Sequence, residues 1–242
     1  MPLSHASSLL TEFAPTGILR VALNHGNPIL AGRTPRGEPA GISISIACAL
    51  AQHLGLDLRF VEYDRAADVV SAAEQDKWDL CFLAFDPLRA RMIAFAPPYL
   101  QIKGSYLAGP ATTATGAEEL VASGVPIGAV EGSAYTLTLQ RRPGSEHLVI
   151  FRNFQSLARA LDDGGVAAIA GIDTVMRAEA DKRPGTRVLD PPFMEIRQAI
   201  GVPQGRPAAT AELAAWLSKQ LRNGSIAEIL EEHGVGRECL VT

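Results

Sequence analysis

The stretch that decides the fold is Asp79-Leu80-Cys81-Phe82-Leu83-Ala84-Phe85-Asp86-Pro87-Leu88-Arg89, which continues to Phe95-Ala96-Pro97-Pro98-Tyr99. Its short apolar run, Leu80 to Ala84, is typical of a buried strand in a parallel sheet. Asp86 and Pro87 then end the strand and predict a short helix, with Asp86 as its N-cap and Pro87 at the first helical position. Arg89 would therefore lie just beyond the carboxyl end of a parallel strand, where open α/β sheets bind their ligands.

Arg89 is the first candidate binding residue. A guanidinium has a permanent positive charge and planar donors, which suit a small carboxylate. Free backbone N–H groups at the start of the adjacent helix would add to that site. Taken alone, the residues favour the alternative, a solvated surface arginine that forms an ion pair with Asp86.

The sequence before this stretch predicts a β-α-β-α-β unit. Ile42, Ile46, Leu50 and Leu54 recur every four residues, which indicates a helix with one buried face. Alternating strands and helices of this kind are typical of a parallel sheet covered by helices. We expect residues 1–16 to be a loose lead-in, followed by strands at 18–23, 56–63 and 80–84 and helices at 42–54 and 66–77.

A second α/β unit follows an extended apolar segment at 100–108 and a turn-rich one at 110–116. Here we expect helices at 118–123, 133–141, 154–161 and 174–181, and strands at 126–130, 147–151, 166–170 and 187–189. The chain then returns through 197–202. Two helices, 208–222 and 225–233, end it, with Asn223-Gly224 as the C-cap between them and Ser225 capping the second.

These motifs resemble those of solute-binding proteins of family 3, the amino-acid-binding type. That family reads G-x-x-D, an apolar strand, T-P-E-R and then F-S-x-P-Y. Trp78-Asp79 matches the first part, Asp86-Pro87-Leu88-Arg89 stands where T-P-E-R would be, and Phe95 to Tyr99 has the spacing of the last. The similarity extends from Gly17 to about Gly234. It implies an α/β fold of the type II periplasmic-binding-protein kind, with two lobes joined by two crossing strands near 101–108 and 195–202. Lobe one would comprise 1–102 and 197–242, lobe two 103–196, and the ligand cleft would lie between them.

The resemblance also implies how a ligand carboxylate would be held. The backbone at Phe82 and Ala84 and the side chain of Arg89 would bind it from lobe one, and Gly132 to Ala134, including Ser133, from lobe two. The residues themselves support an anion site at Ser133, because a glycine and a hydroxyl at a helix start expose backbone N–H groups. The alternative is that Ser133 is only an N-cap, and both can hold together.

Three further polar residues are candidates. Asn24 could offer amide hydrogen bonds or be part of a polar turn, in a loop where the family often places an aromatic and this chain has Gly26. Asp86, which replaces a threonine, would cap its helix or contact a cationic part of the ligand, and we favour the cap. Amino-acid binders place an aspartate for the ligand ammonium at the end of this strand; here either Ile172 occupies that position or Asp173, one residue further on, takes the role. The alternative for Asp173, as the N-cap of the next helix, is slightly preferred.

The leading functional hypothesis is a non-catalytic protein that binds a small carboxylate-bearing solute, an amino acid or related organic acid, and closes around it by a hinge. If the protein is exported, its partner would be an ABC permease; if it is cytoplasmic, delivery, sensing or sequestration of the ligand stay open. We expect a monomer. The rival is an enzyme of the same fold, a cyclohexadienyl (arogenate/prephenate) dehydratase, with a buried Glu131 or Glu195 as general acid. A third possibility is a ligand-sensing subunit.

Two aromatic residues have alternative positions. Phe193 would line the cleft or pack at the hinge, and Tyr135 would face the cleft or the helix core.

Composition excludes several other functions. The net charge is -4 without basic blocks, so we expect no nucleic-acid binding. The chain lacks phosphate-loop, dinucleotide and nucleophile-elbow motifs and helix-spaced histidine ligands, so we expect no catalytic residue, cofactor or metal. Cys48 and Cys81 read as small core residues. No apolar run reaches transmembrane length. The N-terminus lacks signal-peptide features, which predicts a cytoplasmic protein as written, or a periplasmic one if a leader was removed.

Overall fold

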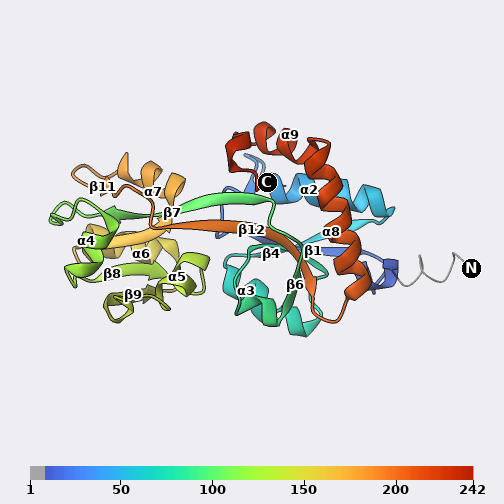
Figure 1. The fold of residues 1–242 in the computed structure, drawn as a ribbon, viewed down its shortest axis with the longest axis horizontal. Helices are drawn as coiled ribbons and strands as arrows, with labels where there is room; N and C mark the ends of the chain where they lie inside the picture. The colour runs from blue at the N-terminus through green and yellow to red at the C-terminus, as the bar shows by residue number, and fades with distance from the viewer. Residues whose placement is uncertain (1–8, 242) are drawn as a thin grey trace, which may run out of the picture. The chain divides into compact units, whose positions relative to one another are not determined.

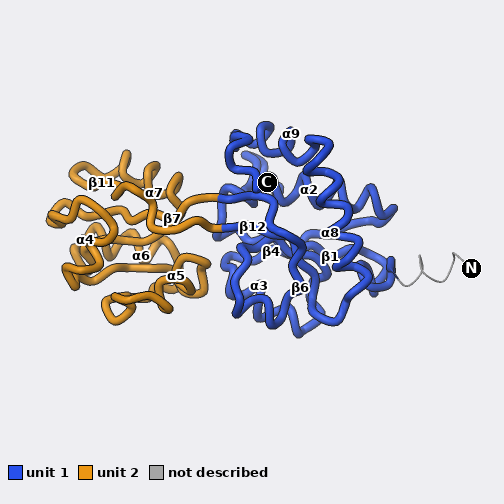
Figure 2. Tube along the Cα trace, viewed as in Figure 1, with its two compact units in different colours: residues 1–101, 197–242 blue, residues 102–196 orange. Residues whose placement is uncertain are grey.

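A computed structural model describes residues 9–241 of the chain. Two compact units are distinguished in Figure 2: unit 1 contains residues 1–101 and 197–242, and unit 2 contains residues 102–196. Two strands, β7 (Leu100–Ala108) and β12 (Met194–Pro203), each begin in one unit and end in the other. Within residues 9–241, none of the helices has the length and apolarity that crossing a bilayer requires.

Unit 1 contains the parallel sheet that the β-α-β-α-β pattern predicted. β1 lies between β4 and β5 and is parallel to both, and β12 continues the sheet antiparallel to β5. β6 pairs with β12, and a separate hairpin is formed by β2 and β3. The strand bounds are β1 (Leu19–Asn24), β2 (Gly32–Arg33), β3 (Pro39–Ala40), β4 (Leu58–Tyr63), β5 (Leu80–Ala84) and β6 (Ile93–Phe95).

The crossovers of unit 1 lie on opposite faces of this sheet. α2 (Ile42–Leu54) leads from β1 to β4, and α3 (Ala66–Ser71) leads from β4 back past β1 to β5. Because such crossovers are right-handed, opposite directions along the sheet place the two helices on opposite faces, as Figure 1 shows.

The helix predicted at 66–77 is shorter than expected. α3 ends at Ser71, and the second half of the predicted helix is a separate 3-10 turn, η1 (Ala73–Gln75).

The buried face of α2 is the one that the sequence indicated. Ile42, Ile46 and Leu50 are fully buried, and the helix ends at Gly55. Cys48, which we expected in the core, is exposed instead. It follows Ile46 by two positions, so it lies on the opposite side of the helix from the buried stripe.

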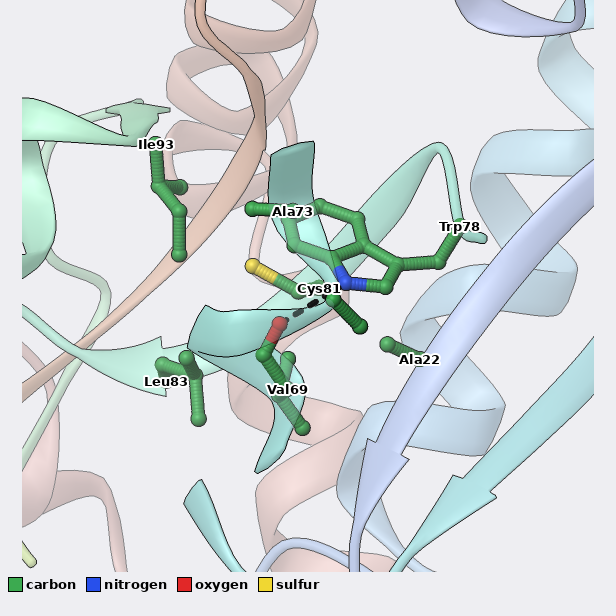
Figure 3. Close-up of a cluster of buried hydrophobic side chains, with 8 residues drawn as sticks. Ala22, Val69, Ala73, Trp78, Cys81, Leu83 and Ile93 are labelled. Atoms are coloured by element: carbon green, nitrogen blue, oxygen red, sulfur yellow. Dashed lines mark hydrogen bonds between the residues drawn. The ribbon is translucent and has the colours of Figure 1, made fainter. Parts of the chain in front are cut away.

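The core beneath β5 is built around Trp78. Its indole is fully buried, and Nε1–H donates to the Val69 carbonyl oxygen over 2.9 Å. Figure 3 shows the surrounding side chains, which come from β1, α3, η1, β5 and β6. Cys81 lies in this cluster, as the sequence predicted. The other buried members are Ala22, Ala72, Ala73, Leu83 and Ile93.

The strands of unit 2 follow the order β7-β10-β8-β9 within the sheet, with β11 beside β7. β10, β8 and β9 are parallel to one another, whereas β7 is antiparallel to β10. Its strands are β8 (Ile127–Val130), β9 (Leu148–Phe151), β10 (Ala168–Ile172) and β11 (Arg187–Val188). Its helices are α4 (Ala117–Ala122), α5 (Ala134–Leu139), α6 (Phe154–Asp162), α7 (Asp173–Ala180) and the 3-10 turn η3 (Ser145–His147).

The chain ends in unit 1 with α8 (Pro207–Arg222), α9 (Ser225–Glu232) and the 3-10 turn η4 (Arg237–Cys239). α9 packs against α2 and α8. Ser225 does not cap α9 as predicted; it is the first helical residue, and Gly224 is the N-cap. At the other end of the chain, we predicted a loose lead-in over residues 1–16. Residues 9–13 are instead helical, and Phe13 in this helix is fully buried. Residues 1–8 lie outside the described part of the chain.

Candidate functional site

Four candidate residues gather at one edge of the unit 1 sheet. Asn24 is the last residue of β1 and Ala84 the last of β5, and these strands are parallel neighbours. Asp86 and Arg89 follow Ala84 directly. The carboxyl ends of parallel strands meet at the same edge, so all four belong to the edge where open α/β sheets bind ligands.

Arg89 is buried, with 3% of its surface exposed, so it is not the solvated surface residue of the alternative. It lies at the start of η2 (Arg89–Arg91), and its Nη1 donates to the Ala84 carbonyl oxygen over 2.9 Å. Burial lowers the pKa of Arg89 to about 10, while the nearby negative charge of Asp86 opposes that shift. The guanidinium remains a cation at neutral pH, enclosed by unit 1.

Asp86 is not the helix N-cap that we favoured from the sequence, since the N-cap of η2 is Leu88, but its carboxylate forms a local turn contact. Its Oδ1 accepts a hydrogen bond from the Leu88 N–H over 2.8 Å. The predicted helix starting at Pro87 is instead a turn followed by η2, a single 3-10 turn that begins at Arg89. Asp86 itself is 2% exposed, so its carboxylate is as buried as the Arg89 guanidinium.

The loop after β1 is tightly folded. Asn24 is 8% exposed, and its Oδ1 accepts from the Gly26 N–H over 3.1 Å. A Cβ at Gly26 would approach the Asp64 carbonyl oxygen to 2.9 Å and Asn24 Oδ1 to 3.0 Å, so any side chain at this position would require the loop to shift. His25 forms a contact of 2.7 Å between its Nε2 and Glu62 Oε2. Of this loop, only Asn24 combines burial with a place at the strand end.

The backbone groups proposed to bind the carboxylate in unit 1 are partly engaged. Phe82 lies opposite Ile200 in the ladder with β12, and Ala84 lies opposite Gln198. Gln198 is 3% exposed, and sequence reasoning missed it. Its only signal was a polar residue inside the return segment at 197–202, and the pairing of β12 with β5 was needed to place it beside Ala84.

In unit 2 the loop between β8 and α5 carries Gly132, Ser133 and Ala134. Gly132 has a φ of 65°, a left-handed conformation that favours glycine. Ser133 is the N-cap of α5: its Oγ accepts from the Thr136 N–H over 3.2 Å and donates to Thr136 Oγ1 over 2.8 Å. The capping alternative is therefore correct for the hydroxyl, whose proton is already used inside the unit.

Ser133→Ala is expected to lower the stability of α5, since losing a serine N-cap costs about 0.5–2 kcal/mol. We expect the Thr136 amide to exchange with solvent about tenfold faster, a change that hydrogen exchange by NMR measures directly. Ser133→Thr keeps the hydroxyl and should restore slow exchange. Unchanged protection of Thr136 in Ser133→Ala would contradict the capping role.

Asp173 lies at the same edge of the unit 2 sheet as this loop, because β10 and β8 are parallel neighbours. It is not an N-cap: β10 runs two residues further than predicted, to Ile172, and Asp173 is the first residue of α7. Its oxygens accept from Ser105 Oγ over 2.6 Å and from Arg177 Nε over 2.9 Å. Burial disfavours the ionised form, but the hydrogen bonds from Arg177 and Ser105 hold the pKa of Asp173 below its ordinary value.

The aromatic candidates of unit 2 pack inward. Phe193 stacks on Tyr106, with ring centroids 4.3 Å apart, and its backbone oxygen accepts from Arg142 Nη1. Tyr135 is 8% exposed, and burial raises the pKa of its phenol to about 12. The Phe193 ring thus packs on Tyr106 and the Tyr135 side chain is buried, while a ligand contact of either residue stays a prediction.

Comparison with known proteins identifies the family. The sequence model of bacterial extracellular solute-binding proteins, family 3, matches residues 19–236. The chain therefore belongs to this family, and its fold is that of type II periplasmic binding proteins. No protein of curated function matches the sequence.

Three solved structures illustrate what the chain is similar to. The solute receptor for L-cysteine of Neisseria gonorrhoeae is 20% identical, with a TM-score of 0.80 over 97% of this chain and 99% of that one. An ancestral amino-acid-binding protein, described as a precursor of cyclohexadienyl dehydratase, is 19% identical, with a TM-score of 0.76 over 92% and 97%. A histidine kinase sensor domain is 20% identical, with a TM-score of 0.77 over 89% and 95%. At these identities the similarity shows the fold alone.

Proposed function

We propose that the protein binds a small carboxylate-bearing solute, an amino acid or a related organic acid, as the substrate-binding protein of an ABC transporter. The observation that carries this proposal is the burial of Arg89 at the carboxyl edge of the parallel sheet. A buried cation at such an edge would offer a ligand carboxylate hydrogen-bond donors in a fixed position. Charge-assisted hydrogen bonds to a carboxylate there contribute about 1.5–3 kcal/mol each.

Residues of both units would make the remaining contacts with the ligand carboxylate. Asn24 and the backbone at Ala84 would assist Arg89, and the loop of Gly132 to Ala134 would offer backbone N–H groups to the same carboxylate. The Ser133 hydroxyl proton is engaged with Thr136, so the main chain of this loop is the better donor. A ligand that contacts both units stabilises the state in which both contacts form, which is the physical basis of hinge closure in this proposal.

Asp173 would bind a ligand ammonium. Its pKa is held below the ordinary value, so it is ionised at neutral pH and suited to a cation. Arg177 already forms an ion pair with it and also contacts Asp190 Oδ1 over 2.7 Å. An ammonium would therefore share the carboxylate with Ser105 and Arg177 rather than find it unpaired.

The dehydratase alternative is less well supported. Glu131 and Glu195, its candidate general acids, are both exposed. A carboxyl group needs burial or a neighbouring negative charge to hold a proton at neutral pH. The expected buried glutamate is thus not found at either position.

A thermal-shift screen tests the proposed function. The wild type would be screened against amino acids, dicarboxylates, polyamines, prephenate and arogenate, beside Arg89→Ala and Arg91→Ala. A ligand at about 100 times its dissociation constant adds about 2.7 kcal/mol to the stability of the folded state. We expect one or more carboxylates to raise the melting temperature of the wild type and of Arg91→Ala but not of Arg89→Ala. Arg91 is the matched control because it is an exposed arginine of the same 3-10 turn.

Each other result has a distinct meaning. A stabilising compound that is recovered chemically unchanged supports binding, whereas one that is consumed would support the dehydratase alternative. Stabilisation by carboxylates that persists in Arg89→Ala, or no stabilisation by any of them, would show that the anion site is wrong. Copurification of the tagged protein with a permease, rather than with a signalling protein, would support the transporter role.

A further inference from the structure

Asp86 and Arg89 form a buried pair of opposite charges at the proposed site. The Ala90 N–H donates to the Asp86 carbonyl oxygen over 2.9 Å, which closes one helical turn across residues 86–90. Residues three apart in such a turn face the same side. Asp86 is 2% exposed and Arg89 is 3% exposed, so little water screens the interaction between them.

The carboxylate of Asp86 is fixed in position. Its Oδ1 accepts from the Leu88 N–H over 2.8 Å, and Arg89 Nη1 is fixed to the Ala84 carbonyl oxygen over 2.9 Å. The two charges therefore remain together whether or not a ligand is present. With one negative and one positive side chain, the formal charge of this buried turn is zero, although its donor geometry suits a carboxylate.

We propose that Asp86 determines ligand specificity by charge: it makes the Arg89 site favour zwitterionic or cationic ligands over anionic ones. The inference rests on the proposed function and specifies the ligand class. A ligand carboxylate bound at Arg89 is also repelled by Asp86. In a zwitterion the ammonium offsets this repulsion, and in a cationic ligand the second positive charge adds attraction. A second carboxylate adds repulsion, because charges interact strongly where water is excluded.

The test is Asp86→Asn, which removes the charge and retains an oxygen for the Leu88 N–H. Isothermal titration with L-glutamate, L-glutamine and L-arginine gives a series in which the first two differ almost only in charge. We expect the ratio of the glutamate to the glutamine dissociation constant to fall about tenfold or more in Asp86→Asn, which corresponds to about 1.4 kcal/mol. Arginine should bind more weakly than to the wild type.

The matched control is Asp57→Asn. Asp57 is an exposed aspartate of unit 1 just before β4, at the opposite edge of the same sheet. The Asp57→Asn substitution changes the net charge by the same amount as Asp86→Asn, but away from Arg89. It should therefore leave the ratio of the glutamate to the glutamine dissociation constant unchanged. A shift as large as that of Asp86→Asn would mean that only net charge matters and would overturn the inference.

The remaining outcomes separate this inference from the proposed function. If Asp86→Asn changes all three affinities by the same factor, Asp86 acts only by shaping the turn, and charge selection is wrong while carboxylate binding stands. If none of the three probes shows binding that Arg89→Ala abolishes, the inference is overturned as well. The wider screen then decides the proposed function separately.

Discussion

Asp79→Ala is expected to lower the free energy of unfolding of unit 1 by about 3–5 kcal/mol, because it removes the fully buried counter-charge of Arg20 and leaves that buried arginine only the exposed carboxylate of Asp76. Asp79 is fully buried. Its Oδ2 accepts from Arg20 Nε over 2.8 Å, and its Oδ1 accepts from Arg206 Nη1 over 2.8 Å. Arg20, at 7% exposure, could not recover that interaction from solvent.

The same contacts give the pH dependence. Burial alone would raise the pKa of Asp79, but the hydrogen bonds from Arg20 and Arg206 hold it below its ordinary value. A carboxyl whose folded-state pKa is lowered stabilises the protein above its unfolded pKa, about 4, and loses that contribution as pH falls through the folded-state value. The difference between wild type and Asp79→Ala should therefore shrink below about pH 4.

Urea unfolding followed by tryptophan fluorescence measures this effect, because both tryptophans, Trp78 and Trp216, lie in unit 1. Asp76→Ala is the control. Asp76 also contacts Arg20 and Arg206, but its side chain is 66% exposed, so its loss should cost no more than about 1 kcal/mol. Equal losses in the two variants would show that burial of Asp79 is not what makes its ion pairs important.

The elements of this fold were predictable because their signals are local. The apolar run Leu80 to Ala84 and the four-residue stripe of α2 are the buried strand and helix of the structure. Errors arose where local rules compete with tertiary packing. Cys48 looked apolar in sequence but lies on the open face of α2, and β10 extends to Ile172 because it pairs with β7 as far as Gly104.

The candidate site was less predictable, because its properties depend on residues distant in sequence. The motif placed Arg89 at a strand end, yet its burial depends on how unit 1 packs. Asp173 was recognised, but its partner Ser105 is 68 positions away on β7. Asp79 was noticed only as a motif residue, and nothing local indicated that Arg206 would contact it. Side-chain pairing across strands is set by register, which one sequence alone does not specify.

Trp78→Ala is expected to cost about 3–5 kcal/mol of the free energy of unfolding of unit 1, the usual range for removing a fully buried large aromatic. The change leaves a cavity among Val69, Cys81 and Leu83. It also removes the hydrogen bond that links the Trp78 indole to α3 through the Val69 carbonyl oxygen. Trp78→Phe keeps most of the ring volume and should cost distinctly less. Urea unfolding of both variants, read by Trp216 fluorescence, checks the order.

The same variant distinguishes support of the fold from binding by the site. Trp78 supports β5 from beneath, whereas Arg89 lies beyond its carboxyl end. Below its melting temperature, Trp78→Ala should therefore still be stabilised by the ligand that Arg89→Ala no longer binds, and the size of that stabilisation should match the wild type. If Trp78→Ala instead lost ligand stabilisation while still folded, the position of Arg89 would depend on this core, and the anion site would extend through β5 to the indole.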